Sequence, residues 1–321
     1  MSQADIVVLG NSNVDLNAYL PHTPTEGETV IATDFQMGLG GKGANQAVAA
    51  SRAGAGVSFI GALGDDSFAT MMRSGLEAEN IDLEHLLVVP GPSANATIWV
   101  EPSGANRIAV FLGASAHLEP DSVGQAVGAH PGAGYFISQL ELHQDVVHAG
   151  LVSAKAAGLT TVLNTAPFGD LQPGILEHTD WLIANEIETE ALLAGHGMTI
   201  SLDGPLDDIL AALPDWASAI GCHLIVTLGS HGAVGYRLGE RPFFTPAPAV
   251  TPIDTVGAGD CCVGYFVALL SHGFSWQQAL HAAVHAASSS VERPGAQASY
   301  PAASEAEAFF RLAREANGTD T

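Results

Sequence analysis

The chain has 321 residues, 47% of them hydrophobic, and is long enough to bury the core of one large α/β domain. Its 34 acidic residues face only ten lysines and arginines, and the formal net charge of -24 argues against nucleic acid or an anionic membrane surface as a partner. No apolar run reaches the roughly 18 residues that span a bilayer, and the first residues lack a signal-peptide pattern, so we expect a cytoplasmic protein. The three cysteines, Cys222, Cys261 and Cys262, provide neither a disulfide framework nor a CxxC metal motif.

The first predicted element is a buried strand over residues 4–10, a continuous apolar run (ADIVVLG) that ends in glycine. A polar cluster, Asn11 to Asp15, follows at its carboxyl end, which is where open α/β sheets bind ligands. The short segments over residues 16–37 have little helical period, and we interpret them as strands of a small flanking sheet.

A glycine loop enters an alanine-rich helix over residues 38–53, with Lys42, Asn45 and Gln46 in the loop and the first turn. A glycine string alone is weak support for a ligand site, because glycine loops also make plain tight turns. Lysine, however, occurs in this chain only at positions 42 and 155. A lysine kept inside Gly-Gly-Lys-Gly therefore suggests that Lys42 has a function.

Buried strands alternate with helical segments through the rest of the chain, which predicts a mostly parallel sheet with helices on both faces. These strands are expected over residues 57–63, 135–140, 160–164, 181–184 and 223–228, with a helix over residues 64–80 and a last helix over residues 304–316. A β-hairpin over residues 94–113 joins the segments near 16–37 as a small β-sheet lid, so we expect a single domain, residues 1–321, with this lid attached.

Polar side chains collect at the carboxyl ends of these strands, as expected of one active-site crevice. They are Asn13, Asp15, Glu141, Asn185 and Glu188.

Asp254 to Asp260 reads DTVGAGD and leads without a break into an apolar run, which predicts a helix that begins between Gly257 and Asp260. The free N–H groups of such an end bind anions, and glycine lets a phosphate oxygen approach the backbone. The residues leave two interpretations of Asp260 open: a proton acceptor beside a transferring phosphoryl group, or a plain helix cap.

These motifs resemble the ribokinase, or PfkB, family of carbohydrate kinases over nearly the whole chain. The matching segments are residues 10–15 (GNSNVD), 40–46 (GGKGANQ), 185–188 (NEIE) and 254–260 (DTVGAGD). The last segment marks the family, and the second points toward the ribokinases within it.

The resemblance implies ATP-dependent phosphorylation of the primary hydroxyl of D-ribose. Asp260 would be the base, and the N–H groups of Gly257, Ala258 and Gly259 would hold the developing phosphoryl charge. The expected sugar-binding residues are Asn13, Asp15, Gly41, Lys42, Asn45, Glu141 and Asp260.

The resemblance also implies ATP, Mg²⁺ and K⁺. Asn185 and Glu188 would order Mg²⁺ through water, and ATP would lie over Thr227, Gly229, Ser230, Gly232 and Gly259. The positions that match the potassium site are Asp254, Val256, Ser290, Arg293, Gly295 and Ser299, where an arginine can contribute only its carbonyl oxygen.

Three features depart from the family pattern. Cys261-Cys262-Val263-Gly264 replaces the common Thr-Phe-Asn-Gly, Val284 occupies a position that is often Asn or His, and Asn95 and Trp99 in the hairpin suggest a pocket shaped for a sugar other than ribose. The alternatives are a deoxyribose or nucleoside kinase, or a non-catalytic sugar-binding relative, although the last has no need for a base beside an anion hole. The apolar lid suggests a homodimer.

Overall fold

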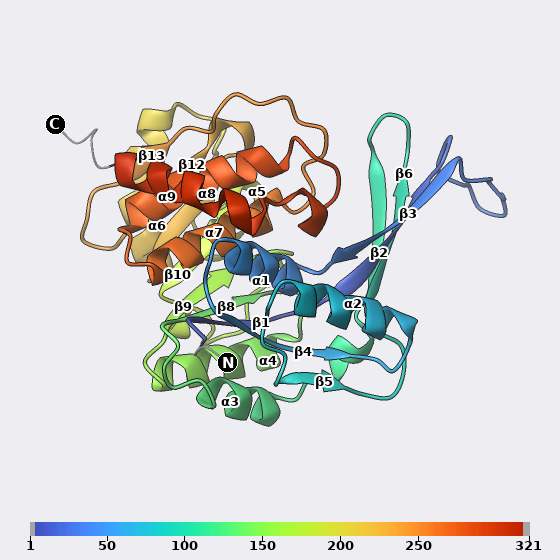
Figure 1. Ribbon diagram of the computed structural model, residues 1–321. Helices are drawn as coiled ribbons and strands as arrows, with labels where there is room; N and C mark the ends of the chain where they lie inside the picture. The colour runs from blue at the N-terminus through green and yellow to red at the C-terminus, as the bar shows by residue number, and fades with distance from the viewer. Residues whose placement is uncertain (1–3, 317–321) are drawn as a thin grey trace.

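A nine-stranded sheet forms the centre of this computed structural model, which describes residues 4–316 (Figure 1). In spatial order its strands are β13 (Phe243–Thr245), β12 (Ala233–Tyr236), β11 (His223–Thr227), β10 (Trp181–Asn185), β9 (Thr160–Asn164), β8 (Tyr135–Gln139), β1 (Ile6–Leu9), β4 (Val57–Leu63) and β5 (Leu86–Val88). The pairs from β11 to β5 are parallel, and β12 pairs antiparallel with both of its neighbours. The predicted mostly parallel sheet is confirmed.

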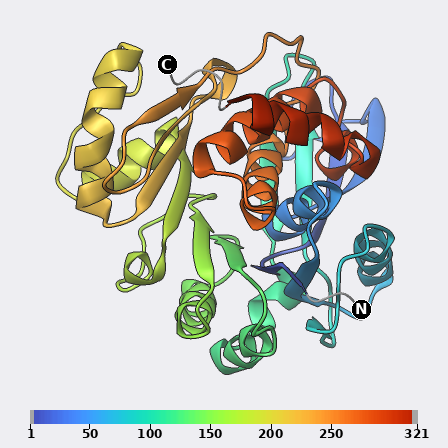
Figure 2. The same cartoon turned by 60° about the vertical axis from the view of Figure 1, so that its left-hand side comes forward.

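Side chains of successive residues in β1 enter two different cores, because neighbouring side chains of a strand point to opposite faces. Ile6 and Val8 belong to the core under α1 (Lys42–Arg52), α2 (Ser67–Ala78), α7 (Ala258–Ser271), α8 (Trp276–Ser290) and α9 (Ala306–Glu315). Val7 and Leu9 belong to the core under α3 (Pro120–Gly128), α4 (Gln144–Ala156), α5 (Glu186–Gly195) and α6 (Leu206–Ile220). Helices thus cover both faces, as predicted (Figure 2).

A separate four-stranded sheet projects beside α1 and α2 (Figure 1). Its order is β3 (Asp34–Gly40), β2 (Asn13–Tyr19), β6 (Asn95–Val100) and β7 (Asn106–Phe111), with β2 and β6 parallel. We call this the small sheet. The expected hairpin is present as β6 and β7.

The predicted glycine loop begins later than expected. Residues 38–40 are the end of β3 rather than loop, because they pair with β2, where Gly38 faces Asp15 and Gly40 faces Asn13. Helix α1 therefore starts at Lys42, directly after the strand and Gly41.

Helix α7 lies in the interior, and ten of its residues are buried. It begins at Ala258 with Gly257 as N-cap, as the sequence predicts, and packs against α1 and α8. Across residues 4–316, no helix combines the length and the apolar character that crossing a membrane requires.

The contact between α1 and α7 depends on Gly264. A Cβ at this position would lie 2.5 Å from the Gln46 carbonyl oxygen and 2.6 Å from the Ala49 Cβ. The two helices can approach this closely only because the side chain is missing.

We therefore predict that Gly264→Ala lowers the free energy of unfolding by about 1–3 kcal/mol, since overpacking forces the helices apart. Urea denaturation followed by circular dichroism measures this change. Gly128→Ala in α3 is the matched control, because an added Cβ meets no heavy atom within 4 Å there. Equal losses in the two variants would contradict the packing argument.

Candidate active site

Polar residues end four neighbouring strands of the large sheet. Gln139 ends β8, Asn164 ends β9, Asn185 ends β10 and Thr227 ends β11. Because these strands are parallel and adjacent, the four residues lie along one edge of the sheet. The first turn of α7 faces the same place, since a cavity of about 240 Å³ is lined by Asn164, Asn185 and Thr227 together with Gly257, Gly259 and Asp260.

The first turn of α7 exposes backbone donors. Gly257 has φ 76°, and a Cβ there would lie 2.6 Å from the Tyr300 hydroxyl, so the position requires glycine. Within residues 4–316 the N–H groups of Gly257, Gly259 and Asp260 have no hydrogen-bond partner, while that of Ala258 lies 3.3 Å from the Thr255 carbonyl oxygen. This arrangement is suited to holding an anion.

The Asp260 carboxylate is buried and does not cap α7. Its Oδ2 accepts a hydrogen bond from Asn45 Nδ2 at 2.9 Å, and its Oδ1 accepts one from Gln46 Nε2 at 2.9 Å. Both donors come from α1, whereas the N-cap position of α7 is Gly257 and makes no side-chain bond. The interpretation of Asp260 as a plain helix cap is therefore wrong.

Lys42 lies among three carboxylates. Burial lowers the pKa of its ammonium group, but the negative charges of Asp260, Glu141 and Glu188 outweigh this effect and raise the pKa above its usual value. Lys42 lines the same cavity as Asp260 and Glu188. It makes no ion pair within 4.0 Å in the described part of the chain, so the ammonium group is available to a ligand.

Glu141 ties the start of α1 to the end of β8. Its Oε2 accepts a hydrogen bond from the Lys42 backbone N–H at 2.8 Å, and the Asn11 amide lies 3.5 Å away. Gly41 makes this approach possible, because a Cβ on it would lie 2.6 Å from the Asn11 carbonyl oxygen. Burial raises the pKa of Glu141 to about 7, against the opposing charge of Lys42.

Asn13 and Asp15 lie on one face of β2, where Asn13 Nδ2 donates to Asp15 Oδ1 at 2.6 Å. Burial raises the pKa of Asp15, the Asn13 hydrogen bond opposes this effect, and the charge of Asp260 adds to it. The sugar-binding residues predicted from the sequence thus come together around Asp260.

A second cavity, of about 390 Å³, adjoins the first and shares Thr227, Thr255 and Gly259 with it. The predicted nucleotide-binding residues Thr227, Gly229, Ser230 and Gly232 line one part of it, and the rest is mostly apolar. The apolar and small lining residues are Ala247, Pro248, Ala249, Val250, Pro252, Ala258, Val284, Ala287 and Val291.

Two departures from the family pattern lie in this second cavity. Cys262 and Val284 both line it. His285, the neighbour of Val284, instead places its ring 4.6 Å from the ring of His281, measured between centroids. The cavity is therefore shaped by an apolar wall at the position where the family often has Asn or His.

Asn185 and Glu188 form a capping box at the start of α5. Asn185 Oδ1 accepts from the Glu188 N–H at 2.8 Å, and Glu188 Oε2 accepts from the Asn185 N–H at 3.0 Å. Both residues line the 240 Å³ cavity. A carboxylate and an amide fixed at an oxygen-rich cavity fit Mg²⁺ held through water.

The two segments of the predicted potassium site meet at Asp254. Its Oδ2 accepts from the Gly295 N–H at 2.8 Å and its Oδ1 from the Val256 N–H at 3.0 Å. The Arg293 guanidinium binds Glu305 at 3.3 Å, which leaves the carbonyl oxygen of Arg293 as its only possible ligand. The hydroxyls of Ser290 and Ser299 donate hydrogen bonds to backbone carbonyl oxygens, those of Ala287 and Ala296. Carbonyl and carboxylate oxygens are suitable ligands for a hard cation.

The sequence analysis assigned no role to four buried amides that surround Asp260. They are Gln46, Gln139, Asn164 and Gln297. Gln139 and Asn164 are the last residues of strands, so the same strand-end rule that selected Asn185 could have found them. Gln297 donates to Asn45 Oδ1 at 3.0 Å from a short 3₁₀ helix near the other end of the chain, for which the sequence offers no local signal.

The suggestion that Asn95 and Trp99 shape the sugar pocket is wrong. In the register of the small sheet, Asn95 pairs with Val14 and Trp99 with Ala18, so both lie on the face opposite Asp15. Ala96 pairs with Asp15 and is the β6 residue beside it on that face.

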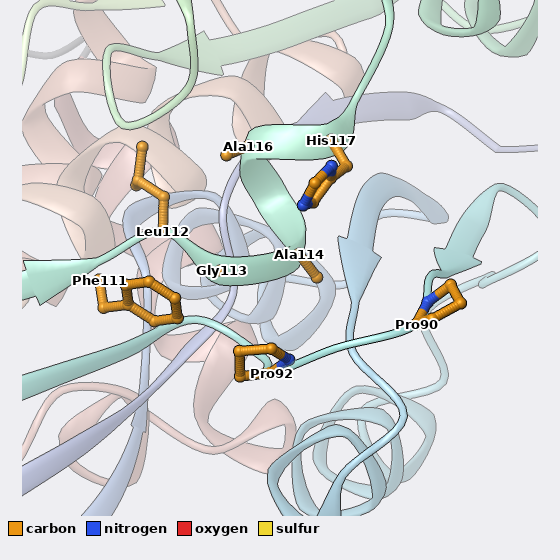
Figure 3. Close-up of a pocket in the computed structure, with 8 residues that line it drawn as sticks. All are labelled: Pro90, Pro92, Phe111, Leu112, Gly113, Ala114, Ala116 and His117. Atoms are coloured by element: carbon orange, nitrogen blue, oxygen red, sulfur yellow. The ribbon is translucent and has the colours of Figure 1, made fainter.

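Another hollow, of about 330 Å³, lies where β7 ends (Figure 3). Prolines, a glycine and apolar residues line it, together with one titratable residue, His117. It contains no carboxylate or side-chain amide, and it lacks the groups that surround Asp260.

Comparisons with known proteins agree with this geometry. The profile of the pfkB family carbohydrate kinases matches residues 3–303. A deoxyribokinase from Salmonella typhi is 33% identical over 310 residues, covering 96% of this chain and 99% of its own, and a Bacillus subtilis ribokinase is 32% identical over 303 residues, covering 94% and 98%. The structure of Arabidopsis thaliana ribokinase complexed with ribose and ATP superposes with a TM-score of 0.84 at 26% identity, covering 97% and 99%.

The raised pKa of Glu141 has a consequence for stability. Between pH 4.5 and about 7 the folded protein binds a proton at Glu141 that the unfolded chain has released. We predict that the wild-type protein loses stability relative to Glu141→Gln as the pH rises through this window. Urea denaturation of both proteins from pH 4 to 8 measures the difference, and a constant difference or the opposite trend would contradict the assignment.

Proposed function

Because this chain belongs to the pfkB family of carbohydrate kinases, we propose that it transfers the γ-phosphoryl group of ATP to the primary hydroxyl of D-ribose, giving ribose 5-phosphate. The observation that carries the proposal is the Asp260 carboxylate, which two amides hold between the polar cluster on β2 and the free N–H groups of α7. The B. subtilis ribokinase and the Arabidopsis structure with ribose and ATP support ribose as the acceptor.

In this proposal Asp260 takes the proton of the attacking hydroxyl. The N–H groups of Gly257 and Gly259, with a contribution from Ala258, stabilise the charge that develops on the phosphoryl oxygens, and Lys42 adds a positive charge from the same cavity. No covalent intermediate is needed, because positioning and electrostatics supply the catalysis in such transfers. Mg²⁺ bound with ATP would neutralise phosphate charge, and Asn185 and Glu188 would hold it.

Ribose offers several hydroxyls, each a donor and an acceptor, and the site offers both kinds of partner. The proposed sugar-binding groups are the side chains of Asn13, Asp15, Lys42, Asn45, Glu141 and Asp260, with the backbone of Gly41. ATP would occupy the 390 Å³ cavity, with its γ-phosphate at Gly259, one of the three residues that both cavities share.

A potassium ion held at the Asp254 loop would place a positive charge near the free N–H groups at the start of α7. The loop contacts that join Asp254 to Gly295 and to Val291 lie within a few residues of Gly257. We also place the protein in the cytoplasm, where ATP is available, without nucleic-acid or membrane partners, as the net charge of -24 supports.

One observation favours a second substrate. The deoxyribokinase from S. typhi is as similar to this chain as the ribokinases are. A deoxyribose kinase would keep Asp260 and the anion hole and would differ only in its contacts to the sugar.

The small sheet supports a homodimer. It exposes apolar side chains, including Ile108 at 57% and Val110 at 53%, which share the face of Asp15. A second copy of this sheet is the proposed cover.

The substrate prediction is tested by initial rates with magnesium ATP against ribose, deoxyribose, fructose, ribitol and nucleosides, each with and without potassium. Ribose should be the best acceptor, with higher turnover in potassium.

Asp260→Asn should lower kcat by about 10²–10⁴-fold, because it removes the base, while calorimetry still detects sugar binding. A preference for deoxyribose would select the second candidate, and near-normal turnover of Asp260→Asn would overturn the proposed base.

The dimer prediction is tested by sedimentation equilibrium at micromolar concentration. The wild-type protein should sediment as a dimer, and Ile108→Arg should shift it toward monomer because a charge cannot be buried unpaired at the interface. Val152→Arg, at an exposed position of α4, is the matched control and should leave the dimer intact. A monomeric wild-type protein would rule the dimer out.

A further inference from the structure

We propose that Gln46 is a positioning residue that holds the Asp260 carboxylate in line for proton transfer. The inference rests on the proposed function of Asp260 as the base. Gln46 is fully buried, and both polar atoms of its side chain bond other protein side chains, so neither is left to bind a substrate.

The Gln46 amide makes three hydrogen bonds. Nε2 donates to Asp260 Oδ1 at 2.9 Å and to Asn164 Oδ1 at 3.1 Å, and Oε1 accepts from Gln139 Nε2 at 2.6 Å. Asn164 Nδ2 in turn donates to the Ile183 carbonyl oxygen of β10 at 3.0 Å. The amide cannot turn without losing all three bonds, so it fixes Asp260 to the ends of β8 and β9.

The direction of these bonds is set by the carboxylate. Ionised Asp260 can only accept, so Gln46 must present its NH₂ group to it and its oxygen to Gln139. Gln139 must then donate, and its own Oε1 is left buried without a partner in the described chain. A buried acceptor is rarely left unpaired. The unpaired Gln139 Oε1 therefore indicates that the Asp260 carboxylate sets the orientation of the Gln46 and Gln139 amides.

Gln46 and Asn45 contact different oxygens of Asp260 and have different roles. Asn45 donates to Oδ2 and is also a proposed sugar ligand, so its bond can change when the sugar binds. Gln46 holds Oδ1 from the buried side and stays in place. Each carboxylate oxygen keeps a further lone pair, which leaves room for the proton of the attacking hydroxyl.

The positive charge of Lys42 attracts the Asp260 carboxylate away from its position. Its ammonium group attracts the Asp260 carboxylate across the cavity, yet the two form no ion pair within 4.0 Å in the described chain. Without the Gln46 donor only the Asn45 bond to Oδ2 holds the carboxylate, and the charge of Lys42 can draw it aside. The base would then pair with the lysine and leave the line of attack.

The test is the steady-state kinetics of Gln46→Met, which has a similar length and no donor. We expect kcat to fall by about 10–100-fold, as a displaced catalytic group does, while KM for ribose and for ATP stays at the wild-type value. A folded Gln46→Met protein with wild-type kcat, or one that loses KM rather than kcat, would overturn the inference.

Gln139→Met provides an independent test, because Gln139 contacts Gln46 and not Asp260. It should lower kcat less than Gln46→Met does, and the double variant should be no slower than Gln46→Met alone, since both changes act on one carboxylate. Additive losses in the double variant would show that Gln139 does not act on Asp260 through Gln46.

Gln278→Met is the matched control. Gln278 is a buried amide in the capping box of α8, away from Asp260, and its loss should lower the melting temperature without changing kcat. A wild-type protein inactive on every sugar would overturn the proposed function and this inference with it. Active wild type with active Gln46→Met would overturn this inference alone.

Discussion

The whole site depends on burying one negative charge, that of Asp260, at the first turn of an interior helix. An unpaired buried carboxylate is costly, so the surrounding chain must supply donors. It does so with Asn45 and Gln46 from α1 and with the charge of Lys42. Gly264 lets α1 approach α7 closely enough for these side chains to reach. The close packing of α1 on α7 is therefore also what brings the donors of Asp260 within reach.

The two cavities differ in chemistry, since one is lined mainly by polar groups and the other mainly by apolar ones. Around Asp260 the site consists of amides, carboxylates and one lysine, which suits a hydroxyl-rich sugar. In the 390 Å³ cavity, residues such as Val284 and Val250 form an apolar wall, which suits the proposed nucleotide. Gly259 stands where the two cavities meet, with its backbone N–H unpaired in the described chain, which is where a transferring phosphoryl group would be stabilised.

Local patterns predicted much of this arrangement. The apolar runs gave the central strands, and Gly257 to Asp260 gave the start of α7. Register and tertiary contacts could not be read in the same way. Trp99 lies on the other face of the small sheet from Asp15, and the face of a strand residue depends on strand pairing. Gln297 bonds Asn45 although 252 positions of sequence separate them. The short antiparallel strands β12 and β13 were not predicted, since four and three residues carry too little periodicity.

The central claim is that Asp260 directs the primary hydroxyl of a pentose at the γ-phosphate of ATP. The most direct measurement is phosphorus NMR of the products formed from ribose and magnesium ATP, with proton correlation to locate the new ester. The account predicts one phosphate ester, on the C5 hydroxyl, formed mole for mole with ADP. An ester on the anomeric hydroxyl, or inorganic phosphate released in proportion to ADP, would contradict it.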